Sequence, residues 1–245
     1  MEGRLTRKDV YTFIRDYWHD AFPDLPSYQA FCRRLNNLVP ALQALAEVWS
    51  GVLCANFEDS VQYIVDSCPI IVAKQARSGF AKVAREYCDK SYNSSRKEYY
   101  YGVKLHAVVV RRPGQLPIAE ILMLSKASTY DLTAAKDILL NSPLRHHGFL
   151  LADKAYIDSG WKEELEHLGI RLITPRKRAK GERYISGDAY STAVSEKRQP
   201  IESFFNWINN RFHIQKASFV RSLAGLLFHV FSAIAASLIY LIFNS

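Results

Sequence analysis

The pattern of elements after residue 100 restricts the fold of this chain more than any other feature of its sequence. Residues 102–110 and 116–124 are apolar runs joined by a short turn at residues 111–114, which predicts a β-hairpin. Two later apolar runs, residues 149–153 and 170–174, are instead separated by amphipathic helical segments. Hairpin strands pair antiparallel, whereas strands separated by helices pair in parallel. The sequence therefore predicts an α/β fold with a mixed sheet and helices on both faces.

Composition limits the class of protein and its partners. With 245 residues, 49% of them hydrophobic and 23% charged, the chain is globular and long enough for one large domain with a small arm. Its 32 Lys and Arg exceed its 24 acids by eight, a balance that suits a nucleic acid or an anionic membrane surface. The four cysteines form no CxxC pair, which argues against a zinc knuckle or a disulfide framework. The charged N-terminus argues against secretion, so we expect a cytoplasmic protein.

Residues 1–55 predict a helical N-terminal arm, and residues 56–245 predict the catalytic domain. Apolar residues recur at helical spacing from Val10 onward, and a second helix is expected to begin after Ser27 as its N-cap. The cations on this second helix either form a solvated face of an arm packed on the core or contact DNA.

Residues 74–104 combine eight Lys or Arg with three acids and five interleaved tyrosines. Basic residues with aromatics can follow a phosphate backbone and stack bases. A solvated, irregular loop with packed tyrosines explains the same composition, and the sequence leaves both interpretations open.

Three acids from separate elements predict a metal site. Asp66 ends the apolar run of residues 61–66 before an expected turn at residues 67–69, and Asp153 ends a later run. Glu202 follows Pro200, which we expect to be the first residue of a helix. Each acid alone has a structural explanation, as a cap or an ion-pair partner. Together they supply the carboxylate oxygens that bind Mg²⁺ in phosphoryl transfer, expected where strand ends meet.

Cations near these acids are candidates for phosphate contacts, which supply salt-sensitive affinity without sequence preference. Residues 171–183 hold six cations, with Glu182 as the one acid, although a disordered basic loop explains this too. Lys154 could equally pair with an acid. The residues predicted to contact DNA are Lys104, Lys154, Arg176, Lys177, Arg178, Lys180 and Arg198.

Residues 222–243 are almost wholly apolar and long enough to span a hydrocarbon core. His229 near the middle and several Ser and Gly positions favour a helix buried in a globular core instead. We therefore expect no membrane partner, with a membrane anchor as the alternative.

Four motifs of this chain resemble a bacterial insertion-sequence DDE transposase, and most closely the IS982 family within the IS4-like group. They are residues 64–67, 101–106, 151–156 and 198–205 (Ile-Val-Asp-Ser, Tyr-Gly-Val-Lys-Leu-His, Leu-Ala-Asp-Lys-Ala-Tyr and Arg-Gln-Pro-Ile-Glu-Ser-Phe-Phe). The resemblance covers about residues 55–240 and implies an RNase H-like catalytic core. It also implies that Asp66, Asp153 and Glu202 are catalytic and bind Mg²⁺, with Mn²⁺ as a substitute.

The activity implied is cleavage at transposon ends, followed by attack of the freed 3′-hydroxyl on target DNA. The implied partners are double-stranded DNA and further copies of the chain, in the bacterial cytoplasm at the nucleoid. Arg198 stands four residues before Glu202 as the IS4-type signature requires, but Ser195 and Asn209 replace its Tyr and Lys, whose roles cannot be carried over. The alternatives are an RNase H-like nuclease and a transposase-derived DNA-binding protein without catalysis.

Overall fold

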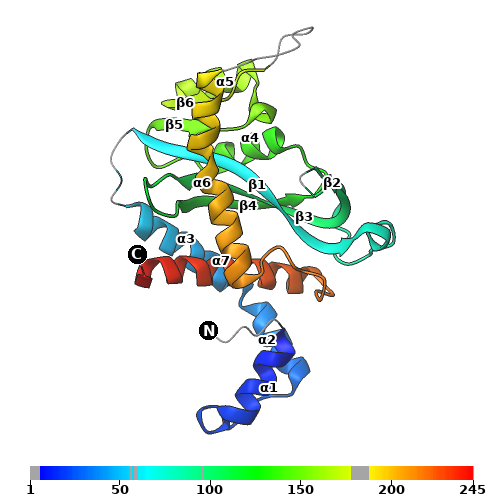
Figure 1. Cartoon of the computed structure of the whole chain (residues 1–245). Coiled ribbons are helices and arrows are strands. Elements are labelled where there is room, and N and C mark those ends of the chain that lie inside the picture. The colour runs from blue at the N-terminus through cyan, green and yellow to red at the C-terminus, as the bar shows by residue number, and fades with distance from the viewer. Residues whose placement is uncertain (1–5, 56, 58–59, 95, 178–187, 245) are drawn as a thin grey trace.

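The structure is a computed structural model that describes residues 6–55, 57, 60–94, 96–177 and 188–244. In this part of the chain, six strands form one mixed sheet around a long central strand (Figure 1). The strands are β1 (Val61–Lys74), β2 (Asp89–Asn93), β3 (Glu98–Val110), β4 (Ile118–Lys126), β5 (Gly148–Leu151) and β6 (Ile170–Ile173).

Strand directions confirm the predicted mixed sheet. β3 is antiparallel to β1, and both β4 and β2 are antiparallel to β3, so the predicted hairpin is the pair β3 and β4. β5 is parallel to β1, and β6 is parallel to β5. The resulting order β4–β3–β1–β5–β6 has an antiparallel half and a parallel half, as expected for an RNase H-like core.

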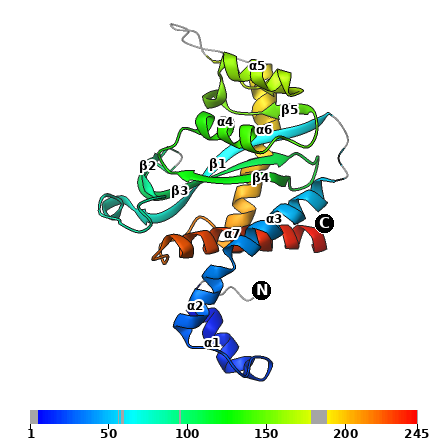
Figure 2. The same ribbon diagram turned by 180° about the vertical axis from the view of Figure 1, so that it is seen from behind.

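Helices cover both faces of the sheet, as predicted. α4 and α5 lie on one face, while α6 crosses the other and meets α7 (Figures 1 and 2). The described helices are α1 (Arg7–Tyr17), α2 (Tyr28–Asn37), α3 (Val39–Cys54), α4 (Asp131–Asn141), α5 (Ser159–His167), α6 (Ala189–Phe212) and α7 (Leu223–Asn244). Short 3₁₀ turns are η1 (His19–Ala21), η2 (Gln75–Gly79) and η3 (Lys154–Tyr156).

Alternation along β1 explains why the sheet has two separate cores. Successive side chains of a strand point to opposite faces, so Ile64 packs with Phe204 of α6. The neighbouring Val65 packs with Ile138 of α4 and Trp161 of α5. β1 is therefore buried on both faces, which is why its sequence is a nearly continuous apolar run.

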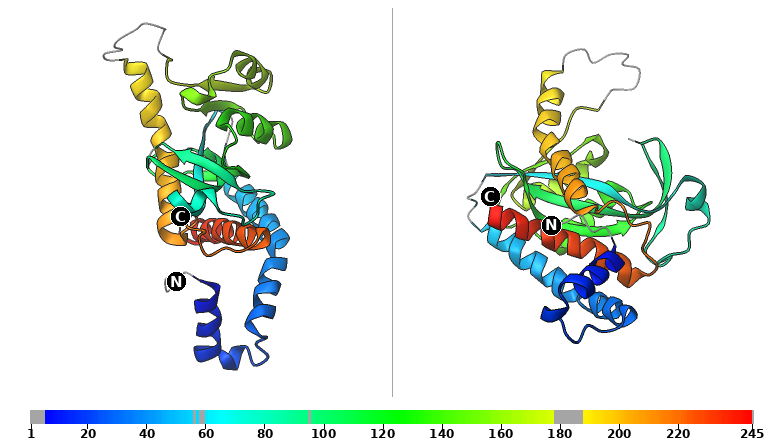
Figure 3. Two further views of the ribbon diagram at one scale, coloured as in Figure 1. Left: turned by 90° about the vertical axis from the view of Figure 1, so that its right-hand side faces the viewer. Right: turned by 60° about the horizontal axis from the view of Figure 1, so that its bottom comes forward.

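The N-terminal helices form an arm whose first two helices project from the body (Figure 3). Thr6 and Asp9 form a capping box at α1, and Ser27 caps α2 as predicted. Neither α1 nor α2 contains a fully buried residue. α3 is different, because Val39, Ala46, Ser50 and Cys54 are buried, and the Ser50 hydroxyl donates to the Ala119 carbonyl at 2.8 Å.

The turn predicted at residues 67–69 is wrong, because β1 continues through it to Lys74. Pro69 is tolerated because its nitrogen points away from β3, to the side of β1 where no described strand pairs with it. The N–H of Ile71 points away from β3 to the Gln215 carbonyl, so the nitrogen of Pro69, two residues earlier, points to that same side. β5 no longer pairs with β1 there, so the missing N–H breaks no ladder bond.

The helix predicted to begin at Pro200 begins at Ala189 instead, and Pro200 lies in its interior. Asp188 caps the helix by accepting from the Ser191 N–H at 3.3 Å. Proline inside a helix removes one backbone hydrogen bond, which a long helix anchored by buried side chains tolerates. Glu202 is therefore a mid-helix residue, and the capping explanation for it no longer applies.

α7 corresponds to the apolar segment whose environment the sequence left open. By length and composition it could span a membrane, and it is the one such helix in the described part of the chain. In the structure it packs beside α3, and Leu226, Val230, Ile234 and Leu238 are buried in the core with residues of α6 (Figure 3). One face of α7 is therefore buried in the core, whereas Ile239 and Phe243 are exposed.

The anchoring of α6 can be tested by truncating its buried side chains. Phe204 is fully buried against the sheet, so Phe204→Ala should lower the free energy of unfolding by about 3–5 kcal/mol. Urea denaturation followed by circular dichroism measures this. The matched control is Asn206→Ala, which is exposed on the same helix and should change stability by no more than about 0.5 kcal/mol. Equal effects of the two substitutions would contradict this packing of α6.

Candidate active site

The active-site candidate lies where β1 runs on past the end of β5. The two parallel strands pair from Val61 to Ile64, and the last pair joins Ile64 to Leu151. Asp66 and Asp153 each follow that last pair by two residues. Because side chains alternate with a period of two, both carboxylates leave on the side of the sheet that α6 covers. The register therefore places these two acids at the same end of the sheet, and the convergence of all three acids on one metal position stays a prediction.

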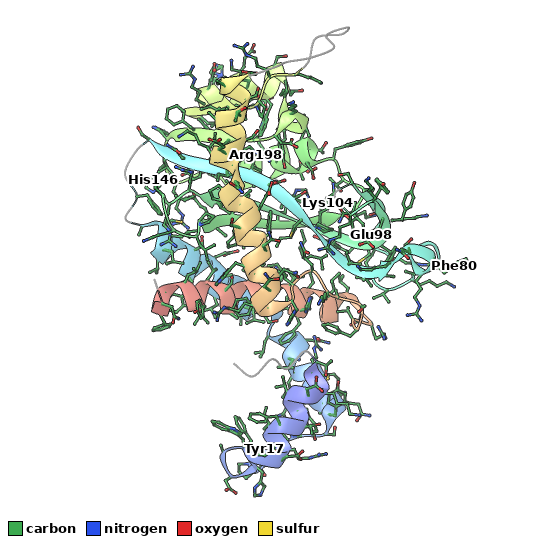
Figure 4. All side chains as sticks on the ribbon, viewed as in Figure 1. Tyr17, Phe80, Glu98, Lys104, His146 and Arg198 are labelled. Atoms are coloured by element: carbon green, nitrogen blue, oxygen red, sulfur yellow. The ribbon has the colours of Figure 1, made fainter. Side chains whose placement is uncertain are left out.

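Asp66 is held by two hydrogen bonds. Its Oδ1 accepts from the Ser67 N–H at 2.8 Å, and its Oδ2 accepts from the Arg198 guanidinium at 3.3 Å. The Asp66 side chain is 26% exposed and that of Arg198 is 15% exposed. Arg198 therefore links α6 to the central strand, and Figure 4 shows it where the helix crosses β1.

Burial raises the pKa of Asp66 to about 6. The nearby carboxylates of Asp153 and Asp131 act in the same direction, whereas the Ser67 N–H and Arg198 oppose the shift. A negative charge at Asp66 is thus only partly compensated by the protein itself. Partly compensated carboxylates that share an edge are suited to bind a cation.

Asp153 occupies the turn directly after β5. Its side chain caps η3 by accepting from the Ala155 N–H at 2.6 Å, and it remains partly exposed. Glu202 lies one helical turn after Arg198 on α6, with an exposed side chain. Within the described residues, no three His, Cys, Asp or Glu side chains are close enough together to hold a metal ion. The structure thus brings Asp66 and Asp153 together and leaves Glu202 on the adjoining helix.

Asp131, an acid in the first turn of α4, was not among the predicted site residues. Asp131 Oδ1 accepts from the Ser67 hydroxyl at 2.9 Å and from the Lys104 ammonium at 3.1 Å. Both donors lie on the sheet face opposite to Asp66. The sequence gives little indication of these contacts because Ser67 and Lys104 are 64 and 27 residues away from Asp131.

Two buried polar groups, the His106 ring and the Tyr156 hydroxyl, lie near these carboxylates. The His106 Nε2 is 2.7 Å from the Ser125 hydroxyl, while its Nδ1 is 3.9 Å from Asp131 and has no hydrogen-bond partner among the described residues. Burial lowers the pKa of His106 to about 4, so the ring is neutral near pH 7. The buried Tyr156 hydroxyl is also unpaired within this part of the chain, and burial and the surrounding carboxylates raise its pKa.

The predicted DNA-contacting cations have different surroundings. Lys104 is largely buried and donates to the Thr129 carbonyl as well as to Asp131, so its charge is already partnered. Lys154 is exposed beside Asp153. Arg176 and Lys177 are exposed after β6, and the Arg176 guanidinium lies 5.9 Å from the ring centre of Tyr190. Arg178 and Lys180 lie outside the described residues.

Comparison with protein families identifies the class of protein to which this chain belongs. A family model described as the transposase DDE domain matches residues 59–239. The chain belongs to the DDE transposase family. The protein is therefore a DDE transposase, a polynucleotidyl transferase, and the matched range contains β1, β5 and α6 with all three predicted acids.

A solved structure titled "Crystal structure of the Mos1 Strand Transfer Complex" is similar to this transposase, with 13% sequence identity and a TM-score of 0.27. The similarity covers 97% of this chain and 79% of that chain. The search of curated proteins found no match.

The raised pKa of Asp66 predicts a pH-dependent stability effect. Its folded-state pKa of about 6 lies above the ordinary value of 3.8, so the ionised carboxylate lowers stability increasingly as pH rises. Asp66→Asn removes this effect. Relative to the wild type without metal, the variant should gain about 1 kcal/mol of unfolding free energy between pH 5 and pH 8.

Urea denaturation of both proteins at several pH values measures the difference. Asp158→Asn is the control, because its N-cap bond to the Trp161 N–H and its bond from Lys136 lower the pKa of Asp158. The control should show no gain as pH rises. Parallel pH profiles for wild type and Asp66→Asn would refute the uncompensated charge at Asp66.

Proposed function

We propose that this transposase cleaves DNA at transposon ends and joins the freed 3′-hydroxyl to target DNA, with Asp66, Asp153 and Glu202 as its catalytic carboxylates. The observation that carries the proposal is the register of β1 and β5, which sets two of the three acids at one sheet edge. Glu202 lies on α6 four residues after the arginine that contacts Asp66. The family assignment supports the same reaction.

The reaction has two steps, cleavage and joining. The joining step leaves the number of phosphodiester bonds unchanged. In cleavage, water attacks a phosphorus atom and the bond to a 3′-oxygen breaks, which leaves a free 3′-hydroxyl. In joining, that hydroxyl loses its proton and attacks a target phosphorus, and one phosphorus–oxygen bond forms as another breaks. Catalysis of such steps consists mainly of positioning and charge stabilisation.

The donor set suits Mg²⁺, with Mn²⁺ as a substitute. Asp66, Asp153 and Glu202 offer only carboxylate oxygens, the ligands that hard divalent cations prefer. The partly compensated charge at Asp66 favours a cation at the same edge. When bound, divalent ions activate the attacking oxygen and stabilise the leaving oxygen.

The remaining residues bind and orient the DNA in this proposal. Arg198 holds Asp66 toward α6 and offsets its charge while the site is free of DNA. Exposed Lys154, Arg176 and Lys177 contact phosphates beside the site, together with Arg178 and Lys180. Lys104 differs from these surface cations, because its ammonium is paired with Asp131 on the sheet face opposite to Asp66.

The finer assignments are also proposals. Motifs around Asp66, Asp153 and Glu202 support membership of the IS982 family within the IS4-like group. We divide the chain into a helical arm, residues 1–55, and a catalytic domain, residues 56–245, although α3 packs on α7 and β4. The transposase would act on double-stranded DNA as a homo-oligomer, in the bacterial cytoplasm at the nucleoid and without a membrane partner.

A second function, DNA binding without catalysis, is favoured by one observation. Within the described residues no three His, Cys, Asp or Glu side chains lie close enough together to hold a metal ion, and Glu202 is exposed on α6. This alternative predicts normal DNA affinity with no nicking in Mg²⁺ or Mn²⁺.

Substitution of Asp153 separates these functions. Asp153→Asn keeps the shape of the side chain but removes its charge, so cleavage and strand transfer in Mg²⁺ should fall by on the order of a thousandfold. Binding to non-specific duplex should stay within about twofold, since phosphate contacts dominate affinity. Strand transfer is assayed with a pre-cut end, which distinguishes a transposase from a nuclease.

Asp158→Asn serves as the matched control, because it changes a carboxylate five residues along the same segment that caps α5. The control should retain activity. Unchanged cleavage by Asp153→Asn would exclude Asp153 from the catalytic site, and a wild-type chain that binds DNA but nicks it in neither metal would establish the binding-only function.

A further inference from the structure

After β1 the chain forms a projection at one end of the sheet, which we name the finger and define as the described residues 75–94 and 96–99. It consists of η2, the segment after it, β2 and the start of β3, and Figure 1 shows it extending away from the end of β1. We infer that the finger binds the phosphate backbone of duplex DNA at a distance from the catalytic acids. This inference rests on the proposed DNA transposition.

The charge of the finger identifies the chemistry of its partner. It contains six cations and three acids, and all six cations are exposed (Arg77, Lys82, Arg85, Lys90, Arg96 and Lys97). Two of the acids are already bound within the protein. Asp89 accepts from the backbone N–H of Ser128 at 2.9 Å and from its hydroxyl, and Glu98 pairs with Lys74 at 3.2 Å. The uncompensated charge is therefore positive and suits a polyanion.

Most of these cations have no acidic partner to compete with a phosphate. Within the described residues, no ion pair involves Arg77, Lys82, Arg85 or Lys97. Arg96 donates to the Gln215 side chain at 3.0 Å, which is a neutral partner. An incoming phosphate would thus displace water and counterions rather than protein carboxylates.

Aromatic side chains add neutral hydrogen-bond donors to this surface. Tyr92 and Tyr99 form a cross-strand pair with ring centres 5.0 Å apart, and the Lys90 ammonium lies 4.7 Å from the Tyr99 ring centre. The two tyrosines are about half exposed, at 50% and 54%. Rings held by a neighbour and a cation lose little freedom on binding, and tyrosine hydroxyls donate to phosphate oxygens.

The finger is attached firmly to the body of the protein, so its charges are presented on a fixed scaffold. The Tyr101 hydroxyl donates to the Val83 carbonyl at 3.0 Å, and Cys88 is buried in the core. The hydrogen bonds of Asp89 to Ser128 tie β2 to the end of β4. A preformed surface of this kind binds at lower entropic cost than a loop that orders on binding.

β1 sets the distance between the finger and the catalytic edge. Lys74, at the end of β1, is eight residues beyond Asp66. A strand rises about 3.3 Å per residue, so the base of the finger lies roughly 26 Å from Asp66. Since base pairs are spaced by about 3.4 Å, DNA lying along β1 would meet the finger about eight base pairs from the phosphate at Asp66.

Salt-dependent binding tests the inference without catalysis. The probe is a fluorescently labelled 30-base-pair duplex of arbitrary sequence, titrated by anisotropy in EDTA over a series of KCl concentrations. Lys82→Ala/Arg85→Ala should weaken binding about tenfold at 0.1 M KCl and reduce the slope of log affinity against log salt by about two. Lys136→Ala/Arg145→Ala removes two exposed or half-exposed cations outside the finger and should reduce the slope by less than about 0.5.

A second variant isolates the tyrosine hydroxyls. Tyr92→Phe/Tyr99→Phe keeps both rings and should weaken binding about threefold without changing the salt slope, because a neutral donor releases no counterion. Thermal melting checks that each variant is folded.

Equal slopes for the Lys82→Ala/Arg85→Ala and control variants would overturn the inference. A change of sedimenting mass in that variant with an unchanged slope would also overturn it and assign the finger to contact between copies. These failures are distinct from failure of the proposed function, which would appear as loss of binding or of strand transfer by the wild-type protein itself.

Discussion

The pairing of β1 with β5 decides where this transposase presents its acidic groups. Four residue pairs join the strands, and then β5 ends while β1 continues for ten residues. Asp66 and Asp153 leave the two strands at the same level and on the same side. Moving β5 by one residue would turn Asp153 toward the opposite face, so the proposed metal site depends on a register that the buried neighbours Ile64 and Leu151 enforce.

The ionised carboxylate of Asp66 lowers the stability of the fold, while the proposed metal site requires its negative charge. Burial and neighbouring acids raise the pKa of Asp66, and Arg198 compensates that charge only in part. On the other face of β1, Asp131 is more fully satisfied by the Ser67 hydroxyl and the Lys104 ammonium. The two faces therefore differ: the Asp131 carboxylate is paired with donors on one face, whereas the charge of Asp66 is only partly compensated on the other.

Much of the fold could be predicted from the sequence because its signals are local. Apolar runs, a hairpin turn and helical periodicity predicted the mixed sheet. The ends of two apolar runs suggested Asp66 and Asp153 as site residues, although Asp66 lies inside β1, which continues to Lys74. Pro200 misled the prediction because proline favours a first helical turn, whereas the Asp188 cap starts the helix at Ala189, eleven residues before Pro200. Asp131 escaped notice because its partners are distant in sequence, and long-range contacts of this kind leave no periodic signal.

We propose that Asp66, Asp153 and Glu202 surround one metal position, and cleavage of the protein by bound Fe²⁺ tests this arrangement most directly. With ascorbate, Fe²⁺ in place of Mg²⁺ generates hydroxyl radicals that cut the backbone close to the ion. In the DNA-bound protein, mass spectrometry should locate cuts around all three acids, and excess Mg²⁺ or Asp153→Asn should suppress them together. Cuts that spare the segment around Glu202, or that survive Asp153→Asn, would contradict a shared site.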